Sequence, residues 1–307
     1  MVGKSDFSGR DVISMRDFSR EELEFLFEAT KRTEEKGPET TLDGKLVAIL
    51  FFEPSTRTHS TFEIAASALH CRVTGFSSPE KSSTVKGETL HDTVRMYESY
   101  RVDCIVMRHN MMGAARYAAE VAKAPVVSGG DGSREHPTQA MVDMYTMRKQ
   151  FGKIDGLRIG ILGDLKYGRT ASSLSYGLSN YDVEITFVAP DSLSPREEIE
   201  HYLKARNVRV RKTQNVKDVI GDLDVLYVTR IQKERIPDPT EYERVKGLYQ
   251  VNLALLKEGK ESLRVLHPLP RVDELSTDVD ASSYQEYFVQ AGAGVPLRTA
   301  LLGMVMS

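Results

Sequence analysis

Short apolar runs alternate with helical patterns along most of the chain, and this alternation restricts the fold more than any other feature. Residues 46–52 form a continuous apolar run that ends at Glu53 and Pro54, as a buried parallel strand does. Strands that alternate with helices predict parallel sheets flanked by helices, which is an α/β fold. The other predicted strands are 71–76, 103–107, 126–128, 158–162, 183–188, 209–211, 223–228 and 265–266, and the predicted helices are 55–69, 88–100, 114–122, 137–150, 168–181, 195–206 and 296–306.

The length of the chain and a restart of this pattern predict two domains. The chain has 307 residues, which suits two domains of ordinary size, and the alternation begins again near residue 158. A junction at 151–156 fits the pattern, and so does a long helix from Pro137 that bridges the domains. Residues 230–247 carry several charges and two prolines, so we predict a long surface loop there.

Composition argues against several classes of protein. The formal net charge is −3 and no block is rich in Lys or Arg, so we expect no nucleic-acid partner. Cys71 and Cys104 are far apart and form no CxxC pair, which favours reduced thiols in a cytoplasmic protein. The seven histidines are scattered, so we expect no metal site. We see no signal peptide and no apolar run near the ~20 residues of a membrane span, so we expect no membrane partner.

Ser55-Thr56-Arg57-Thr58 stands where a predicted strand gives way to a helix. The first backbone N–H groups of a helix lack internal partners, and together with the helix dipole they form an anion site. The hydroxyl groups and the planar Arg57 guanidinium add donors that suit phosphate oxygens. We therefore predict a phosphate site, and an ordinary Ser/Thr N-cap with an exposed arginine is the alternative.

His136-Pro137-Thr138-Gln139 follows the glycine-rich stretch 129–132. Glycines free the backbone, and Pro137 suits the first position of a helix. This arrangement places His136 and Gln139 near a helix N-terminus, where both side chains can donate hydrogen bonds to a carbonyl oxygen. A buried structural histidine is the alternative.

Residues 163–170 nearly match the nucleotide-binding P-loop, GxxxxGK[ST]. Arg169 stands where that loop needs lysine, and the residues between the two glycines are bulky. We therefore predict that Arg169 lies at a helix start and holds a carboxylate. A P-loop-like nucleotide-binding protein and a tight turn with a solvated arginine are the alternatives.

Arg230 and Gln232 follow the strand predicted at 223–228, and the carboxyl ends of strands are where open α/β sheets bind ligands. In an extended backbone their side chains point the same way, as a clamp for a dicarboxylate requires. The segment continues with Lys233, Glu234 and Arg235, and a charged surface turn explains it equally well.

Two further segments are candidates for ligand contacts. The prolines in His267-Pro268-Leu269-Pro270-Arg271 fix an irregular backbone whose carbonyl groups can accept hydrogen bonds from an –NH2 group, although a stiff connector is the alternative. Lys86 lies in a polar, glycine-containing loop before a predicted helix, and most such lysines are merely solvated.

The motifs, in this order, resemble those of the aspartate carbamoyltransferase family, over residues 51 to 298. Ser-Thr-Arg-Thr and His-Pro-Thr-Gln are shared with ornithine carbamoyltransferases, whereas the Arg-x-Gln and His-Pro-Leu-Pro-Arg segments resemble the aspartate enzymes. The segments that carry the resemblance are 55–58, 86–90, 107–109, 136–139, 163–170, 229–235 and 267–271.

The resemblance implies transfer of the carbamoyl group of carbamoyl phosphate to L-aspartate, in pyrimidine biosynthesis and with no cofactor. It implies a carbamoyl phosphate domain at 1–137 and an aspartate domain at 138–293, with the last helix, 294–307, packing back on the first domain. It also implies a homotrimer with active sites shared between subunits, and it leaves open whether regulatory chains join trimers into a dodecamer. The nearest alternative is a carbamoyltransferase with another amine substrate, such as ornithine, and a catalytically inactive scaffold is another.

Position by position, the resemblance also implies site residues. The phosphate would be held by Ser55, Thr56, Arg57 and Thr58. The carbamoyl oxygen would face Thr58, Arg108 and His136, and the carbamoyl amide would contact Gln139, Pro268 and Leu269, with Pro270 beside them. The aspartate carboxylates would bind Arg169, Arg230 and Gln232, and Lys86 and either Ser82 or Ser83 would come from a neighbouring subunit. We expect the cations Arg57, Lys86, Arg108, Arg169 and Arg230 to share one electropositive cleft between the two lobes.

Overall fold

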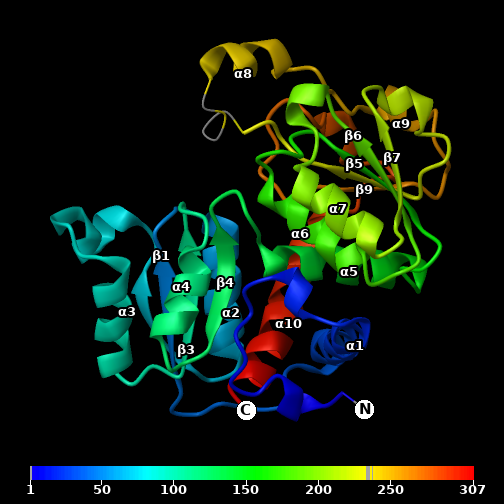
Figure 1. Cartoon of the computed structure of the whole chain (residues 1–307). Coiled ribbons are helices and arrows are strands. Elements are labelled where there is room, and N and C mark those ends of the chain that lie inside the picture. Colours follow the sequence, from blue (N-terminus) through cyan, green and yellow to red (C-terminus); the bar gives the residue numbers. More distant parts are fainter. Residues whose placement is uncertain (1, 233–235, 237) are drawn as a thin grey trace. The chain divides into compact units, whose positions relative to one another are not determined.

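The computed structural model describes residues 2–232, 236 and 238–307, and within it the chain forms two compact units (Figure 1). Unit 1 is Met1–Met141 with Ala293–Ser307, and unit 2 is Val142–Gly292. The chain passes from one unit to the other inside two helices, α5 (Pro137–Phe151) and α10 (Tyr287–Val305).

Unit 1 is built on a parallel sheet with the strand order β2-β1-β3-β4. Its strands are β1 (Leu46–Phe51), β2 (Arg72–Phe76), β3 (Cys104–His109) and β4 (Val126–Asp131). Its helices are α1 (Arg20–Lys36), α2 (Thr56–Ala68), α3 (Leu90–Ser99) and α4 (Ala114–Val121), besides the parts of α5 and α10. Helix α2 packs on β1 and β2, and α4 packs on β3, on β4 and beside α3. A continuous apolar core results, which includes Leu50, Val94, Ile105 and Val126.

Unit 2 is built on a second parallel sheet, with the order β7-β6-β5-β8-β9. Its strands are β5 (Arg158–Leu162), β6 (Glu184–Val188), β7 (Arg209–Thr213), β8 (Val225–Val228) and β9 (Arg264–Leu266). Its helices are α6 (Arg169–Leu178), α7 (Glu197–Ala205), α8 (Pro239–Val245) and α9 (Leu253–Leu256). The central strand β5 is buried beyond its first residue, as expected of a strand covered on both faces. The predicted α/β fold of two parallel sheets flanked by helices is confirmed.

The structure also corrects three expectations about individual elements. Helix α1 was not predicted, although Ser19 and Glu22 form a capping box at its start. Helix α8 interrupts the predicted loop 230–247. Helix α10 begins well before Pro296 and continues through it, so the proline lies inside this helix instead of starting it.

Helix α10 has a second property that the sequence analysis did not anticipate. Its length of 19 residues and mean hydropathy of 1.3 would allow it to cross a membrane by length and composition alone. Two-thirds of that apolar window (67%) is buried inside the structure, as in the core helix of a globular protein. We therefore describe α10 as a core helix.

Gly163, at the carboxyl end of β5, predicts a sharp difference between two glycine substitutions. Its φ is +121°, and a Cβ atom there would lie 2.1 Å from the carbonyl oxygen of Thr229. Gly152 also has a positive φ, +77°, but a Cβ there would meet none of the described atoms within 4 Å. We expect Gly152→Ala to lower the free energy of unfolding by about 1 kcal/mol. Gly163→Ala should lower it by a further ~1–3 kcal/mol, because it adds overpacking. Chemical denaturation of the two variants measures this difference, and equal losses would contradict the packing around Gly163.

Candidate functional site

The site residues predicted in unit 1 follow neighbouring strands at the edge where these strands end. Because the strands are parallel, their carboxyl ends share one edge of the sheet. Ser55 follows β1, and Arg108 is the next-to-last residue of β3, where it pairs in register with Phe51. His136 comes after β4, which is the neighbour of β3. Strands that pair side by side therefore bring three separate motifs to one edge.

The first turn of α2 has the geometry of an anion site. Ser55 occupies the N-cap position in extended conformation, with φ −160° and ψ 111°. Within the described part of the chain its hydroxyl makes no capping hydrogen bond, which differs from the ordinary N-cap alternative. Thr56 and Arg57 are exposed, whereas Thr58 is buried. The helix therefore starts with exposed donors, and Arg57 adds a cation where the helix dipole disfavours one and favours an anion.

Arg108 is held between the ends of β1 and β4. Its Nη2 donates to Glu53 Oε1 at 3.0 Å, and its Nη1 lies 3.4 Å from the carbonyl oxygen of Gly129. A Cβ atom on Gly129 would lie 3.3 Å from the Thr58 methyl group, so Gly129 connects Arg108 with the first turn of α2. The role of Glu53 was not predicted, and its only sequence signal is its place beside Pro54 at the end of an apolar run.

His136 lies directly before α5, and it is 3% exposed. Its carbonyl oxygen accepts hydrogen bonds from the amides of Gln139 and Ala140, so the turn that carries both predicted side chains is regular. The preceding Glu135 carboxylate is buried, and it accepts hydrogen bonds from the Ser14 hydroxyl at 2.6 Å and from the Met15 amide at 2.9 Å. Burial raises the pKa of Glu135, and these hydrogen bonds oppose that shift. The N-terminal segment thus fixes the backbone next to His136.

Lys86 is exposed at the end of a short 3-10 turn, Ser83–Lys86, in the connection that follows β2. A cavity of about 350 Å³ lies beside this turn, and Ser82, Ser83, Lys86 and Glu88 all contribute to its lining. The Ser82 hydroxyl donates to the carbonyl oxygen of Pro79 at 2.8 Å, whereas Ser83 is exposed. Both serines therefore remain candidates for the role that the resemblance implies.

The site residues predicted in unit 2 follow its strands in the same way. Arg169, Arg230 and the segment 267–271 come after β5, β8 and β9, which lie side by side in the sheet. The parallel register again places the three strand ends at one edge. Each unit therefore carries its own group of predicted ligand-binding residues at the carboxyl edge of its sheet.

Arg169 is the first residue of α6 and is only 5% exposed. The turn before it differs from a nucleotide-binding P-loop, because the amide of Tyr167 donates to the buried Asp164 carboxylate at 2.9 Å. A P-loop directs such amides at phosphate, and a carboxylate inside the turn would repel an anion. The geometry favours the predicted arginine site over nucleotide binding.

Arg230 and Gln232 follow β8 and are half-buried. The residue before them, Thr229, is anchored to β5, because its amide and its hydroxyl both donate to the carbonyl oxygen of Leu162, at 2.8 and 3.2 Å. The rest of this motif, 233–235, lies outside the described residues. The backbone directly before Arg230 and Gln232, the predicted clamp, is therefore hydrogen-bonded to β5.

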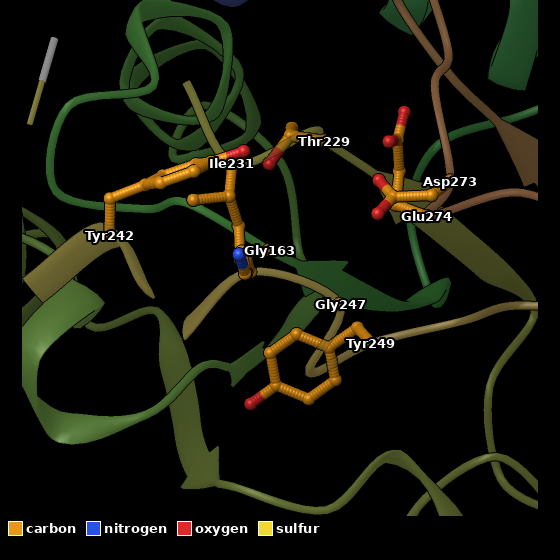
Figure 2. A pocket seen from close by; sticks show the side chains of 9 residues that line it. Gly163, Thr229, Ile231, Tyr242, Gly247, Tyr249, Asp273 and Glu274 are labelled. Atoms are coloured by element: carbon orange, nitrogen blue, oxygen red, sulfur yellow. The ribbon is translucent and has the colours of Figure 1, made fainter. Parts of the chain in front are cut away.

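A small pocket of about 20 Å³ lies next to this segment within unit 2 (Figure 2). Thr229 and Ile231, the two neighbours of the predicted clamp arginine, contribute to its lining. Figure 2 shows Asp273 and Glu274 together on one side of the pocket and Tyr242, from α8, beside Ile231. The pocket is lined by Gly163, directly after β5, and by Thr229, directly after β8, so it lies at the carboxyl ends of these two strands.

The proline-containing segment after β9 is pinned at both ends. His267 Nε2 lies 2.7 Å from Glu274 Oε1, and the Arg271 guanidinium makes a bidentate ion pair with Asp280. Between these ends, Pro268 and Leu269 are half-buried and Pro270 is exposed. The segment whose backbone carbonyl groups are predicted to contact an amide is therefore held at both ends and is partly exposed.

A candidate metal site would consist of three or more neighbouring His, Cys, Asp or Glu side chains. The residues that the structure describes contain no such group.

Comparison with known protein families covers nearly the whole chain. Residues 10–149 match the aspartate/ornithine carbamoyltransferase family in its carbamoyl-P binding domain, and residues 155–305 match that family in its Asp/Orn binding domain.

Curated relatives agree with this match. The chain is 53% identical over 305 residues to the aspartate carbamoyltransferase catalytic subunit of Thermococcus gammatolerans, covering 98% of this chain and 99% of the relative. It is also 53% identical over 301 residues to that of Pyrobaculum calidifontis, covering 97% and 98% of the two chains.

Solved structures agree as well. Aspartate transcarbamoylase from Trypanosoma cruzi in complex with carbamoyl phosphate and aspartate superposes with a TM-score of 0.92 at 36% identity, covering 100% of this chain and 99% of that chain. The same enzyme in complex with N-(phosphonacetyl)-L-aspartic acid gives 0.91 at 38% identity, covering 98% and 97%. The M. jannaschii catalytic subunit gives 0.86 at 44% identity, covering 96% and 97%. The resemblance read from the motifs is thus confirmed, and the chain belongs to the aspartate/ornithine carbamoyltransferase family.

Proposed function

We propose that this protein is an aspartate carbamoyltransferase, which transfers the carbamoyl group of carbamoyl phosphate to the amino group of L-aspartate. The curated relatives and the T. cruzi complexes support this reaction. The observation on this chain that carries it is the exposed first turn of α2, where Ser55 leaves the helix amides without a side-chain cap among the described residues and Arg57 adds a cation. Unit 1 would bind carbamoyl phosphate and unit 2 would bind aspartate.

Carbamoyl phosphate binding would use the edge of the first sheet. Ser55, Thr56, Arg57 and Thr58 would hold the phosphate through hydroxyl groups, helix amides and the guanidinium group. The carbamoyl oxygen would face Thr58, Arg108 and His136. Gln139 and the segment 268–270 would contact the carbamoyl amide, because backbone carbonyl groups can accept its two N–H bonds.

Aspartate binding would use the edge of the second sheet. Its two carboxylates require cationic or amide donors, which Arg169, Arg230 and Gln232 supply. N-(phosphonacetyl)-L-aspartic acid, the compound in one T. cruzi complex, joins a phosphonate to an aspartate group. Its phosphonate half would correspond to the residues proposed to bind phosphate in unit 1, and its aspartate half to those proposed to bind aspartate in unit 2.

The reaction would be a direct acyl transfer. The free amine of aspartate attacks the carbamoyl carbon, the new N–C bond forms, and the C–O bond to phosphate breaks with its electron pair leaving on phosphate. The negative charge that develops on the carbamoyl oxygen is stabilised by donors aimed at it, namely Thr58, Arg108 and His136. The leaving phosphate can accept the amine proton, so the step needs no protein base. Positioning two anions against each other supplies much of the remaining acceleration.

A trimer with shared sites would complete this arrangement. Lys86 is exposed on its turn, as a residue that enters a neighbouring subunit would be before assembly. Unit 1 also exposes apolar side chains near this turn and after β3, with Val85 63%, Met111 66% and Met112 60% exposed. Exposed apolar groups of this size favour contact with another chain.

The wider role follows from the proposed reaction. N-carbamoyl-L-aspartate would enter pyrimidine biosynthesis, and we place the enzyme in the cytoplasm. Cys71 and Cys104 are both free cysteines, which suits a reducing compartment.

The choice of amine substrate is tested by turnover of the purified full chain. With carbamoyl phosphate present, we expect N-carbamoyl-L-aspartate and phosphate from L-aspartate, and at most about 1% of that rate with L-ornithine, because Arg169 and Arg230 bind carboxylates and would repel a second amine. Equal or faster turnover of ornithine would favour the other branch of the family.

The phosphate site is tested by Arg57→Ala. We expect kcat/KM for carbamoyl phosphate to fall by at least about a hundredfold, which is typical for loss of a donor to developing charge. The fold should persist, because Arg57 is exposed and a cation at a helix N-terminus adds no dipole stabilisation. Lys123→Ala is the matched control, because Lys123 is an exposed cation at the opposite end of β4. Near-normal turnover of Arg57→Ala would defeat the site assignment.

The aspartate site is tested by Arg230→Ala. We expect KM for aspartate to rise at least about tenfold, since charged hydrogen bonds are lost, while KM for carbamoyl phosphate changes little. Arg209→Ala, at the first residue of β7, is the control, because its exposed ion pair with Asp182 contributes little. An unchanged dependence on aspartate concentration would count against the role of Arg230.

A further inference from the structure

His267 is buried directly after β9, and its ring joins two parts of the following segment. Its Nδ1 lies 2.8 Å from the amide nitrogen of Leu269, and its Nε2 lies 2.7 Å from Glu274 Oε1. A backbone N–H can only donate, so Nδ1 is the acceptor and must be unprotonated. The ring proton therefore sits on Nε2, which donates to Glu274. This geometry requires a neutral imidazole in one tautomer.

Leu269 has a backbone conformation that needs such support. Its φ is +54°, in the left-handed region that non-glycine residues rarely adopt. A residue in this region is strained and persists only where its surroundings hold it. The hydrogen bond from its amide to His267 is one restraint, and the packing of the Leu269 side chain on the core of unit 2 is another.

The backbone of His267 is itself fixed by a buried polar network within unit 2. Its amide donates to Gln290 Oε1 at 2.8 Å, and Gln290 Nε2 donates to Asp143 Oδ1 at 2.6 Å. The Tyr227 hydroxyl donates to the other oxygen of Asp143 at 2.8 Å. Asp143, Tyr227 and Gln290 are at most 1% exposed, so solvent offers these groups little competition. Helices α5 and α10 thereby fix the start of the segment that leads to Leu269.

Glu274 holds the other side of the ring. Its carboxylate also accepts the Val272 amide, at 3.2 Å from both oxygens. Burial alone would raise the pKa of Glu274, but that pKa is lowered from its ordinary value, and the hydrogen bond from His267 is the largest of the interactions that lower it. An ionised Glu274 can only accept a hydrogen bond, so it favours the His267 tautomer with its proton on Nε2.

We propose that His267 is a positioning residue, whose unprotonated Nδ1 holds the Leu269 amide and so directs the carbonyl groups of Pro268 and Leu269 toward the carbamoyl amide. This inference rests on the proposed function, which gives those carbonyl groups their role. His267 itself touches no substrate in this account. It acts through the backbone that follows it.

Two substitutions at this position separate positioning from simple stability. In His267→Asn the side-chain oxygen is close enough to accept from the amide two residues on, as in an Asx-turn, but the contact with Glu274 is lost. In His267→Gln the longer side chain can still donate to Glu274, but the acceptor for the Leu269 amide is lost. Each variant therefore loses one buried hydrogen bond, and we expect similar decreases in the midpoint of thermal unfolding.

The kinetic expectation differs between the two variants. With both substrates saturating, we expect kcat of His267→Gln to fall about tenfold or more, whereas His267→Asn should stay within about threefold of the wild type. Equal kcat values in the two variants, or losses that follow thermal stability alone, would overturn the positioning role. If the wild-type protein forms no N-carbamoyl-L-aspartate at all, the proposed function fails, and the present inference fails with it.

Hydrogen–deuterium exchange adds a test that needs no enzyme activity. Because prolines have no amide hydrogen, Leu269 and Arg271 carry the only backbone amide hydrogens in 268–271. We expect slow exchange of the Leu269 amide in the wild type and in His267→Asn, and at least about tenfold faster exchange in His267→Gln. Fast exchange at Leu269 in the wild type would overturn the inference, whether or not either variant folds.

Discussion

Parallel pairing of strands is the constraint on which the rest of this protein depends. Within each sheet every strand runs in the same direction as its neighbours, so all carboxyl ends lie at one edge. In unit 1 this edge carries Arg108, near the end of β3, and Ser55 and His136, in the connections after β1 and β4. In unit 2 the corresponding edge carries Arg169 and Arg230. Within each unit, residues far apart in sequence therefore lie at the same edge of the sheet. The hydrogen bonds between strands and the apolar strand residues stabilise the fold, so the residues at the carboxyl edge remain available for ligand binding.

Two of the arginines predicted to bind ligands lie at helix positions that do not favour a cation. Arg57 and Arg169 both lie in the first turn of a helix, where the dipole disfavours a cation. Arg169 is also only 5% exposed, and burial of a charged group carries a desolvation cost. A stabilising sequence would place acidic residues at these positions, as α1 does with Glu21 and Glu22. Under the proposed function, anionic substrates would add a favourable interaction for both arginines.

Much of this organisation could be predicted from the sequence, because it follows from local patterns. Apolar runs such as 46–52 predicted the strands, and the motifs at the ends of these runs predicted the candidate site residues. Interactions between distant residues could not be predicted in this way. The hydrogen bond of Gln290 with Asp143 joins positions 147 residues apart, and the ion pair of Glu53 with Arg108 joins positions 55 apart. The continuation of helix α10 through Pro296 could not be predicted either, because proline locally favours a helix start, whereas this helix is mostly buried in the fold.

The central claim is that the residues of the two sheet edges act on one pair of substrates. Calorimetric titration with N-(phosphonacetyl)-L-aspartic acid tests this most directly, because that compound carries both a phosphonate and an aspartate group. We expect Arg57→Ala and Arg230→Ala each to weaken binding of this single compound by at least about tenfold. Binding of wild-type strength in either variant would show that the two groups of residues do not serve one ligand, and would contradict the account.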